Sequence, residues 1–205
     1  MYAGTLILLV AAAAALGACP FSVWIGRWLL KKNIRDYGDR NPGAWNVFRA
    51  GGHLAGCLAL LLDVGKGIPI VALANYYFVL PERAVYIVGV CAILGHAFSP
   101  FLRFRGGKAV AVTYGVMLAL PQREILMLMA IFMLVGFLVF TVHSWVIILG
   151  PSGSLVFLTI MGGSDVQFLF LLSVLVIFIV KTFPELKVFP GHKGILFQWL
   201  QAIRH

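Results

Sequence analysis

The sequence predicts an all-α integral membrane protein with about seven transmembrane helices, forming a single polytopic membrane domain over residues 1–205. Hydrophobic residues make up 61% of the chain and charged residues only 11%, whereas a soluble domain carries roughly 25% charged residues. The mean hydropathy is +0.99. The apolar runs are separated by short polar segments without a long hydrophilic block, so we expect no separate soluble domain.

Seven apolar segments follow one another, at about residues 3–30, 54–79, 84–100, 108–120, 125–142, 145–161 and 166–180. The first contains Gly17 and Pro20, where a helix is expected to kink or break. The second is disturbed by the Gly-Lys-Gly-Ile-Pro run at 65–69, and the sixth is interrupted at 150–153. The fourth is shorter than the roughly 20 residues that cross the hydrocarbon core, so the turn before it is expected to lie at membrane depth.

The basic residues are distributed unequally between the two ends of these segments. With seven crossings, one side carries Arg27, Lys31, Lys32, Arg35, Arg40, Arg49, Arg103, Arg105, Lys108, Lys181, Lys187, Lys193 and Arg204. The opposite side has only Arg83 and Arg123. By the positive-inside rule, the basic side is cytoplasmic, which places the N-terminus outside and the C-terminus in the cytoplasm.

The net charge of +9 therefore reflects topology and contact with anionic membrane lipids, and we expect no nucleic acid partner. The three cysteines are Cys19, Cys57 and Cys91, which lie in or beside apolar runs without the spacing of a metal site. They are interpreted as small hydrophobic residues. We expect neither a metal nor a cofactor.

A cationic glycine turn lies between the third and fourth segments. Arg103, Arg105 and Lys108 supply positive charge, and Gly106 and Gly107 allow a ligand to approach the backbone without a Cβ in the way. If the following segment is helical, its first free N–H groups point back at this turn. The pattern predicts an anion site at the membrane surface.

The loop between the first and second segments carries a second set of polar residues. Asn41 and Asn46 can orient a polar ligand through their amides, Arg49 can bind a phosphate with its guanidinium fork, and Gly43 permits a tight turn between them. Taken alone, such a loop is also typical of a solvated connection.

The combination of these motifs carries a family resemblance. In order, the pattern reads Ile34-Arg35, Gly38, Asn41, Gly43-Ala44, Asn46, Arg49, Asp63, Lys66-Gly67, Pro69, Gly95-His96 and Phe104-Arg105-Gly106-Gly107-Lys108. It resembles the bacterial acyl-phosphate-dependent glycerol-3-phosphate acyltransferases. The resemblance implies a small seven-helix enzyme of phospholipid biosynthesis in the bacterial inner membrane. Such an enzyme moves a fatty acyl chain from acyl phosphate to glycerol 3-phosphate, yielding lysophosphatidic acid and phosphate, at a site that faces the cytoplasm.

Both implied substrates are anions, so their site needs cations and backbone donors beside an apolar groove for the acyl tail. Acyl phosphate is already activated, and no nucleophile elbow or Ser-His-Asp order is visible, so positioning and charge neutralisation suffice without an acyl-enzyme. The predicted catalytic residues are His96, Lys108 and Arg49. The predicted substrate-binding residues are Asn41, Gly43, Asn46, Arg49, Arg105, Gly106, Gly107, Lys108 and Ser144.

Four of the candidate residues have alternative interpretations. His96, where the third segment meets the glycine turn, is either a site residue or a helix-end histidine bonded to a backbone carbonyl. Asp63 and Lys66, three residues apart in an apolar segment, are interpreted as a structural ion pair that supports the first loop, and the alternative is a functional role for charges within the membrane. Ser144 is either a substrate ligand or a helix N-cap.

The chain also departs from the family pattern. Asp39 and Trp45 stand where the family has hydroxyl residues, and the segments 142–149 and 181–186 lack the family's polar residues. A carboxylate at Asp39 would repel a phosphate unless Arg40 pairs with it or the identity of the substrate has changed. These departures motivate two alternatives, a non-catalytic binder or carrier of phosphorylated metabolites or anionic lipids, and a purely structural membrane subunit. The sequence does not indicate acyl-chain preference, the true acceptor or oligomeric state.

Overall fold

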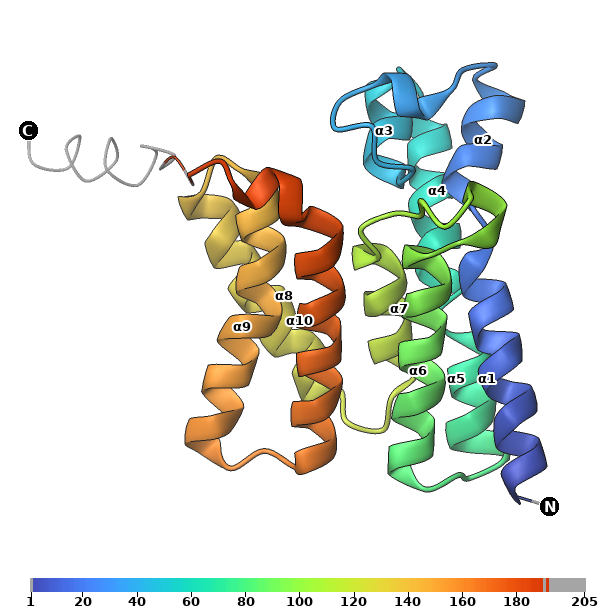
Figure 1. Cartoon of the computed structure of the whole chain (residues 1–205), viewed down its shortest axis with the longest axis vertical. Helices are drawn as coiled ribbons and strands as arrows, with labels where there is room; N and C mark the ends of the chain where they lie inside the picture. The colour runs from blue at the N-terminus through green and yellow to red at the C-terminus, as the bar shows by residue number, and fades with distance from the viewer. Residues whose placement is uncertain (1, 190, 192–205) are drawn as a thin grey trace, which may run out of the picture. The chain divides into compact units, whose positions relative to one another are not determined.

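The computed structural model describes residues 2–189 and 191, and its regular elements are helices (Figure 1). Within these described residues, five helices are long and apolar enough to cross a membrane, namely Tyr2–Leu29, His53–Tyr77, Glu82–Leu102, His143–Met161 and Asp165–Leu186. Two shorter apolar helices are Val110–Ala119 and Glu124–Val139. These correspond in order to the predicted segments, which confirms the all-α membrane fold. The number of crossings and the side each terminus faces stay predictions, and Lys193 and Arg204 lie outside the described residues.

The chain divides into two compact units, Met1–Arg123 and Glu124–His205, and each is described by itself. The prediction of one polytopic membrane domain is not tested by this division. In the first unit the elements are α1 (Tyr2–Ala18), α2 (Phe21–Leu29), η1 (Ile34–Asp36), α3 (Ala44–Arg49), α4 (His53–Gly65), α5 (Pro69–Ala72), η2 (Leu73–Tyr77), α6 (Glu82–Ala97), η3 (Pro100–Leu102) and α7 (Val110–Ala119). The expected breaks are present, because α1 ends before Pro20 and α4 ends at Gly65.

Glycines allow helices of the first unit to pack at backbone distance. A Cβ added to Gly17 of α1 would lie 2.1 Å from the carbonyl oxygen of Ala92 in α6. A Cβ added to Gly95 of α6 would lie 2.2 Å from the carbonyl oxygen of Ala14 in α1. Small residues at such crossings are typical of membrane helix pairs. The contact fixes α6, and therefore the polar turn that follows it, against α1.

The first loop is folded rather than a plain connection. Ile34 of η1 and Val47 of α3 are fully buried. They belong to a hydrophobic cluster whose other buried members are Val23, Ile25, Ala44, Ala55 and Ala59. Burial of these side chains against α2 and α4 fixes η1 and α3 in place. The polar residues between these two short helices are thereby held at one end of the unit.

The predicted pairing of Asp63 and Lys66 is present inside the first unit. Lys66 Nζ lies 2.7 Å from Asp63 Oδ1 and donates a hydrogen bond to the carbonyl oxygen of Cys19 at 2.8 Å. Ser22 donates its hydroxyl hydrogen to Asp63 Oδ2. Both charges are therefore compensated where water is scarce. The pair joins the end of α4 to the break between α1 and α2, because Lys66 bonds to Cys19 directly after α1.

The second unit contains α8 (Glu124–Val139), α9 (His143–Met161) and α10 (Asp165–Leu186). Ser164 and Gln167 form a capping box at the start of α10. The side-chain amide of Gln167 also donates to Glu124 at 3.1 Å, which joins α10 to the start of α8. Pro151 lies inside α9 without ending it, so the predicted interruption of this segment does not break the helix.

Candidate functional site

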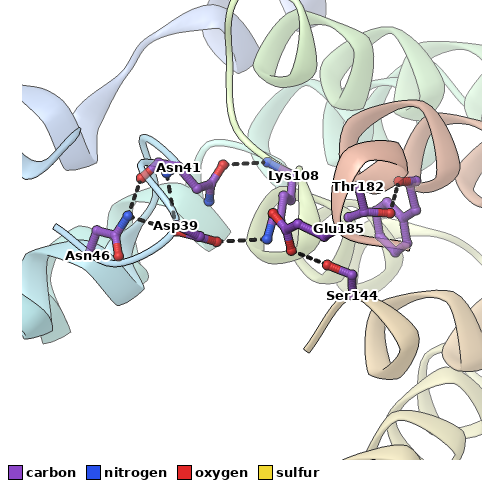
Figure 2. A network of polar contacts seen from close by, with 8 residues as sticks. Asp39, Asn41, Asn46, Lys108, Ser144, Thr182 and Glu185 are labelled. Carbon is purple, nitrogen blue, oxygen red and sulfur yellow. Dashed lines mark hydrogen bonds and ion pairs between the residues drawn. The ribbon is translucent and has the colours of Figure 1, made fainter. Parts of the chain in front are cut away.

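The first loop and the glycine turn are docked against each other in the first unit (Figure 2). The side-chain oxygen of Asn41 accepts a hydrogen bond from the backbone N–H of Lys108 at 3.1 Å. The ammonium group of Lys108 lies 2.7 Å from Oδ2 of Asp39. Residues that are almost 70 positions apart in the sequence thus form one polar cluster. The structure brings together the two halves of the predicted anion site.

Asp39 is at the centre of this cluster. Its Oδ1 accepts hydrogen bonds from the side-chain amide of Asn46 at 2.9 Å and from the backbone N–H of Asn41 at 3.2 Å. Burial by itself raises the pKa of Asp39, but the hydrogen bond and charge of Lys108, with the bonds from Asn41 and Asn46, hold that pKa below its ordinary value of 3.8. Lys108, and not Arg40, supplies the partner charge of Asp39 in this cluster.

The two asparagines also hold each other. Asn46 is almost fully buried, and its side-chain amide donates a second hydrogen bond to the carbonyl oxygen of Asn41 at 2.9 Å. Its side-chain oxygen has no hydrogen-bond partner among the described residues. Gly43 immediately precedes α3, and its N–H donates to the same carbonyl oxygen of Asn41 at 2.9 Å. The predicted turn at Gly43 is present, and it directs Asn41 toward Lys108.

Arg49 ends α3 and lies over the backbone of Gly38. A Cβ added to Gly38 would lie 1.9 Å from Nη1 of Arg49 and 2.6 Å from Oδ1 of Asn46. Gly38 also has φ +54°, a backbone conformation that side chains disfavour. Arg49 is exposed, and within the described residues it forms no ion pair. Its guanidinium is therefore available to an anion beside the Asp39 cluster.

Gly106 and Gly107 pack against His96 at the end of α6. A Cβ on Gly106 would lie 1.9 Å from the carbonyl oxygen of His96, and one on Gly107 would lie 2.4 Å from its Nε2. The glycines are thus required for the turn to reach the buried His96, a reason that the sequence analysis did not anticipate. His96 lies at the junction of helix and turn, as expected.

The following helix begins later than predicted. α7 starts at Val110, after Ala109 with φ +64°, so Lys108 belongs to the irregular turn. Its backbone N–H is bonded to Asn41 and is not a free helix-start donor. The outer part of the turn is fixed by Arg35, whose guanidinium donates to the carbonyl oxygen of Arg105 at 2.8 Å. Burial and then the charges of Arg27 and Arg105 lower the pKa of Arg35.

Ser144 belongs to the second unit, which is described by itself. It is fully buried in α9, and its hydroxyl donates a hydrogen bond to Glu185 of α10 (Figure 2). α9 begins at His143 after Val142, without a side-chain cap. The alternative that Ser144 caps this helix is therefore wrong, and its predicted role toward a ligand is not tested.

This arrangement can bind an anion through an ammonium group, a guanidinium group and amide donors. Within the described residues, no group of three or more His, Cys, Asp and Glu side chains could hold a metal ion. In the sequence, Asp39 stands out only as a departure from the family pattern, and its place at the centre of the cluster is a finding of the structure. A signal was present, because an Asp two residues before a loop Asn is typical of a turn in which the carboxylate accepts the later backbone N–H.

Comparison with known proteins identifies the family. The sequence model described as glycerol-3-phosphate acyltransferase matches residues 7–186. A glycerol-3-phosphate acyltransferase of Lactococcus lactis subsp. lactis is 41% identical over 131 residues, which cover 64% of this chain and 61% of the relative. One of Fusobacterium nucleatum subsp. nucleatum is 42% identical over 123 residues, covering 60% and 62%. The matches thus span about three fifths of the length of these curated relatives.

The fold is also that of a solved structure. A crystal structure of PlsY (YgiH), described as an integral membrane glycerol 3-phosphate acyltransferase in its glycerol 3-phosphate form, is similar with a TM-score of 0.78 and 27% identity. The similarity covers 89% of this chain and 90% of that chain. The same protein in its lysophosphatidic acid form gives a TM-score of 0.77. With the family model matched over residues 7–186, the chain belongs to the glycerol-3-phosphate acyltransferase family.

Proposed function

We propose that this protein is a membrane acyltransferase that moves a fatty acyl chain from acyl phosphate to glycerol 3-phosphate. The observation that carries the proposal is the docking of the first loop onto the glycine turn, with Asn41 bonded to Lys108 at 3.1 Å. It joins amide donors and a buried ammonium group in one cluster, beside which Arg49 presents its guanidinium. Family membership and the names of the relatives, all glycerol-3-phosphate acyltransferases, support acyl transfer to glycerol 3-phosphate.

The proposed chemistry needs no covalent enzyme intermediate. A hydroxyl oxygen of glycerol 3-phosphate attacks the acyl carbon, the bond from that carbon to the phosphate oxygen breaks, and an ester bond forms. The hydroxyl proton is released and phosphate departs, leaving lysophosphatidic acid. Lys108 and Arg49 neutralise phosphate charge, and His96 is positioned behind Gly107 to orient a substrate or transfer the proton.

The remaining predicted residues maintain the shape of the site. Asn41, Gly43 and Asn46 shape the loop, while Arg105, Gly106 and Gly107 shape the turn. Asp63 and Lys66 hold the break between α1 and α2. Ser144 keeps its predicted role as a substrate-binding residue. The non-catalytic alternative is not favoured, because the relatives named above are all described as acyltransferases.

We further propose that the protein lies in the bacterial inner membrane with this cluster facing the cytoplasm. The excess of basic residues on the loops at 31–53 and 101–108 supports that orientation. Membrane lipids surround the apolar helices and accommodate the acyl tail. Cysteines introduced singly at exposed Asp36 and Arg83 test the orientation: an impermeant thiol reagent applied to intact cells should label only position 83, and labelling of position 36 alone would reverse it.

The reaction is tested with purified protein and radiolabelled acyl phosphate. Acyl transfer to glycerol 3-phosphate is expected, with lysophosphatidic acid as the labelled product. Other phosphorylated polyols serve as comparison acceptors. Absence of a labelled product with every acceptor, from protein that is folded in detergent, would overturn the proposed function.

A further inference from the structure

Asp39 already occupies the donors that a phosphate would use. Its Oδ2 lies 2.7 Å from Lys108 Nζ, and its Oδ1 accepts from the Asn46 side chain at 2.9 Å and from the Asn41 backbone at 3.2 Å. An ammonium group, an amide and a backbone N–H are the donors that bind a phosphate oxygen. The protein thus places its own anion in the predicted anion site.

The two partners of the ion pair differ in exposure. The Lys108 side chain is only 10% exposed, whereas the Asp39 side chain is 32% exposed. Lys108 is also fixed through its backbone, because its N–H is bonded to Asn41. Asp39 lies outside any helix, between Gly38 and Arg40, both of which have positive φ. The lysine is therefore the fixed component of the site, and the carboxylate is the component that solvent and ligands can reach.

An ion pair of this kind opposes a second anion. A phosphate that approaches Lys108 meets the negative charge of Asp39, and it must displace the carboxylate or share the ammonium group with it. The nearby charges are Lys108, Arg49 over Gly38, and Arg40 next in sequence. Removal of Asp39 would take away the carboxylate that lies 2.7 Å from Lys108 Nζ.

We propose that Asp39 is an internal counter-anion that fills the phosphate subsite of the unliganded protein and thereby weakens the binding of the phosphorylated substrate. This inference rests on the proposed function for the identity of that substrate. The ligand class is a phosphate mono- or dianion, and it is presented either by acyl phosphate or by glycerol 3-phosphate. Asp39 is a specificity-determining residue in this account, since it acts on the substrate through Lys108.

A role for Asp39 as the base that accepts the hydroxyl proton fits the contacts less well. Both carboxylate oxygens are engaged by donors, and the contacts with Lys108, Asn41 and Asn46 favour the charged form. A carboxylate with a lowered pKa is a weaker base than a free one. Contacts with Lys108, Asn41 and Asn46 that keep the carboxylate charged are those expected of a counter-anion.

Binding of inorganic phosphate to the purified full-length protein tests this inference without turnover. Asp39→Asn should bind phosphate about 3- to 10-fold more tightly than the wild type, because the charge of Asp39 then no longer competes with phosphate for Lys108. Asp39→Glu, which restores the charge, should return the affinity toward the wild-type value. Asp36→Asn is the matched control, since it removes a charge from the same loop without contacting Lys108. Unchanged or weaker binding by Asp39→Asn would overturn the proposal.

Steady-state kinetics identify which substrate carries the phosphate. In Asp39→Asn, the KM of one phosphorylated substrate should fall by a similar factor, while kcat changes less than KM. A lower KM for glycerol 3-phosphate assigns the subsite to the acceptor, and a lower KM for acyl phosphate assigns it to the donor. A purely structural role would raise both KM values or leave them unchanged, and either result would contradict the proposal.

The two proposals fail in different ways. If the wild type transfers no acyl group but Asp39→Asn binds phosphate more tightly, the proposed function fails and the counter-anion stands. If the wild type is active and neither the phosphate affinity nor the KM values respond to Asp39→Asn, only the counter-anion proposal fails.

A second variant and a second measurement guard against misfolding. Should Asp39→Asn not fold, Asp39→Ser replaces it. Infrared difference spectra of the wild type are independent of any variant: added phosphate should shift a carboxylate band, and an unchanged spectrum would refute displacement.

Discussion

The side-chain oxygen of Asn41 accepts the backbone N–H of Lys108 at 3.1 Å. This bond fixes the first loop to the glycine turn independently of any charge, because it joins an amide to a main-chain donor. Its geometry means that the position of Lys108 depends on the conformation of residues 38–46. Substitutions in the loop are therefore expected to shift the turn, and substitutions in the turn are expected to shift the loop.

Arg49→Lys tests the need for a guanidinium fork. Lysine retains the charge but cannot form the paired hydrogen bonds of arginine, and its ammonium group would not cover Gly38 as Nη1 of Arg49 does. We expect kcat/KM for acyl transfer to fall on the order of 10-fold or more. Arg83→Lys, at the start of α6, is the control, because it makes the same substitution outside the cluster. Wild-type kcat/KM in Arg49→Lys would remove the fork from the mechanism.

The order and approximate extent of the helices could be predicted, because hydropathy is a local property of the sequence. The breaks at Pro20 and after Gly65 were equally local, since they depend on residues that disturb a helix wherever they stand. The late start of α7 at Val110 could not be predicted. It depends on Ala109 in a left-handed conformation, which the tertiary fold imposes.

The residues that form the site could be predicted from the sequence, but the ion pair between Asp39 and Lys108 could not. Asn41, Asn46, Arg49 and Lys108 were chosen by residue type, and the structure places all four in one unit. The partner of Lys108 is Asp39, 69 positions away, and only tertiary packing of η1 and α3 brings that carboxylate to the turn. Arg40 is adjacent in sequence to Asp39, but nearness in sequence does not select an ion-pair partner.

The glycines of the turn are expected to differ in their sensitivity to an added methyl group. Gly106→Ala would place Cβ against a backbone carbonyl oxygen of α6, which cannot move freely, so we expect destabilisation of about 1–3 kcal/mol. Gly107→Ala would meet the imidazole of His96, a side chain and not backbone, so the position of His96 and the activity should change more than stability. Thermal unfolding in detergent and acyl-transfer rates distinguish the two.

Gly65→Ala is the matched control, because nothing lies within 4 Å of the added Cβ. It should retain both the unfolding midpoint and the transfer rate. Equal activity loss without destabilisation in Gly106→Ala and Gly107→Ala would contradict the assignment of Gly106 to packing. Full activity in Gly107→Ala would show that the position of His96 is not critical.

The buried pair of Asp63 and Lys66 should be more sensitive to the loss of one partner than to the loss of both. Within the described residues, Lys66→Met leaves Asp63 with only Ser22 as a donor. A buried charge without its partner costs about 3–5 kcal/mol. The double variant Asp63→Leu with Lys66→Met should be more stable than Lys66→Met. Unfolding midpoints in one detergent provide the comparison, and additive losses would show that the pair is not coupled.

The contribution of Asp39 to stability should depend on pH in a definite direction. Its pKa in the folded protein is lower than the ordinary 3.8. The stabilisation is therefore fully present above the unfolded-state pKa and is lost as the pH falls through the lower folded-state value. Without phosphate, the wild type should exceed Asp39→Asn in unfolding midpoint by a constant amount from about pH 8 to pH 5, with the difference shrinking below about pH 4. A difference that disappears near neutral pH would contradict the ion pair.

The most direct test of the account compares the wild type with Lys108→Ala in a product assay. Purified protein is mixed with acyl phosphate and glycerol 3-phosphate, and the lysophosphatidic acid formed and the phosphate released are measured together. We expect equal amounts of the two products from the wild type and a loss of about 100-fold or more in kcat/KM for Lys108→Ala, whose fold is checked by thermal unfolding. Phosphate release without ester formation, or an unchanged rate in folded Lys108→Ala, would contradict the account.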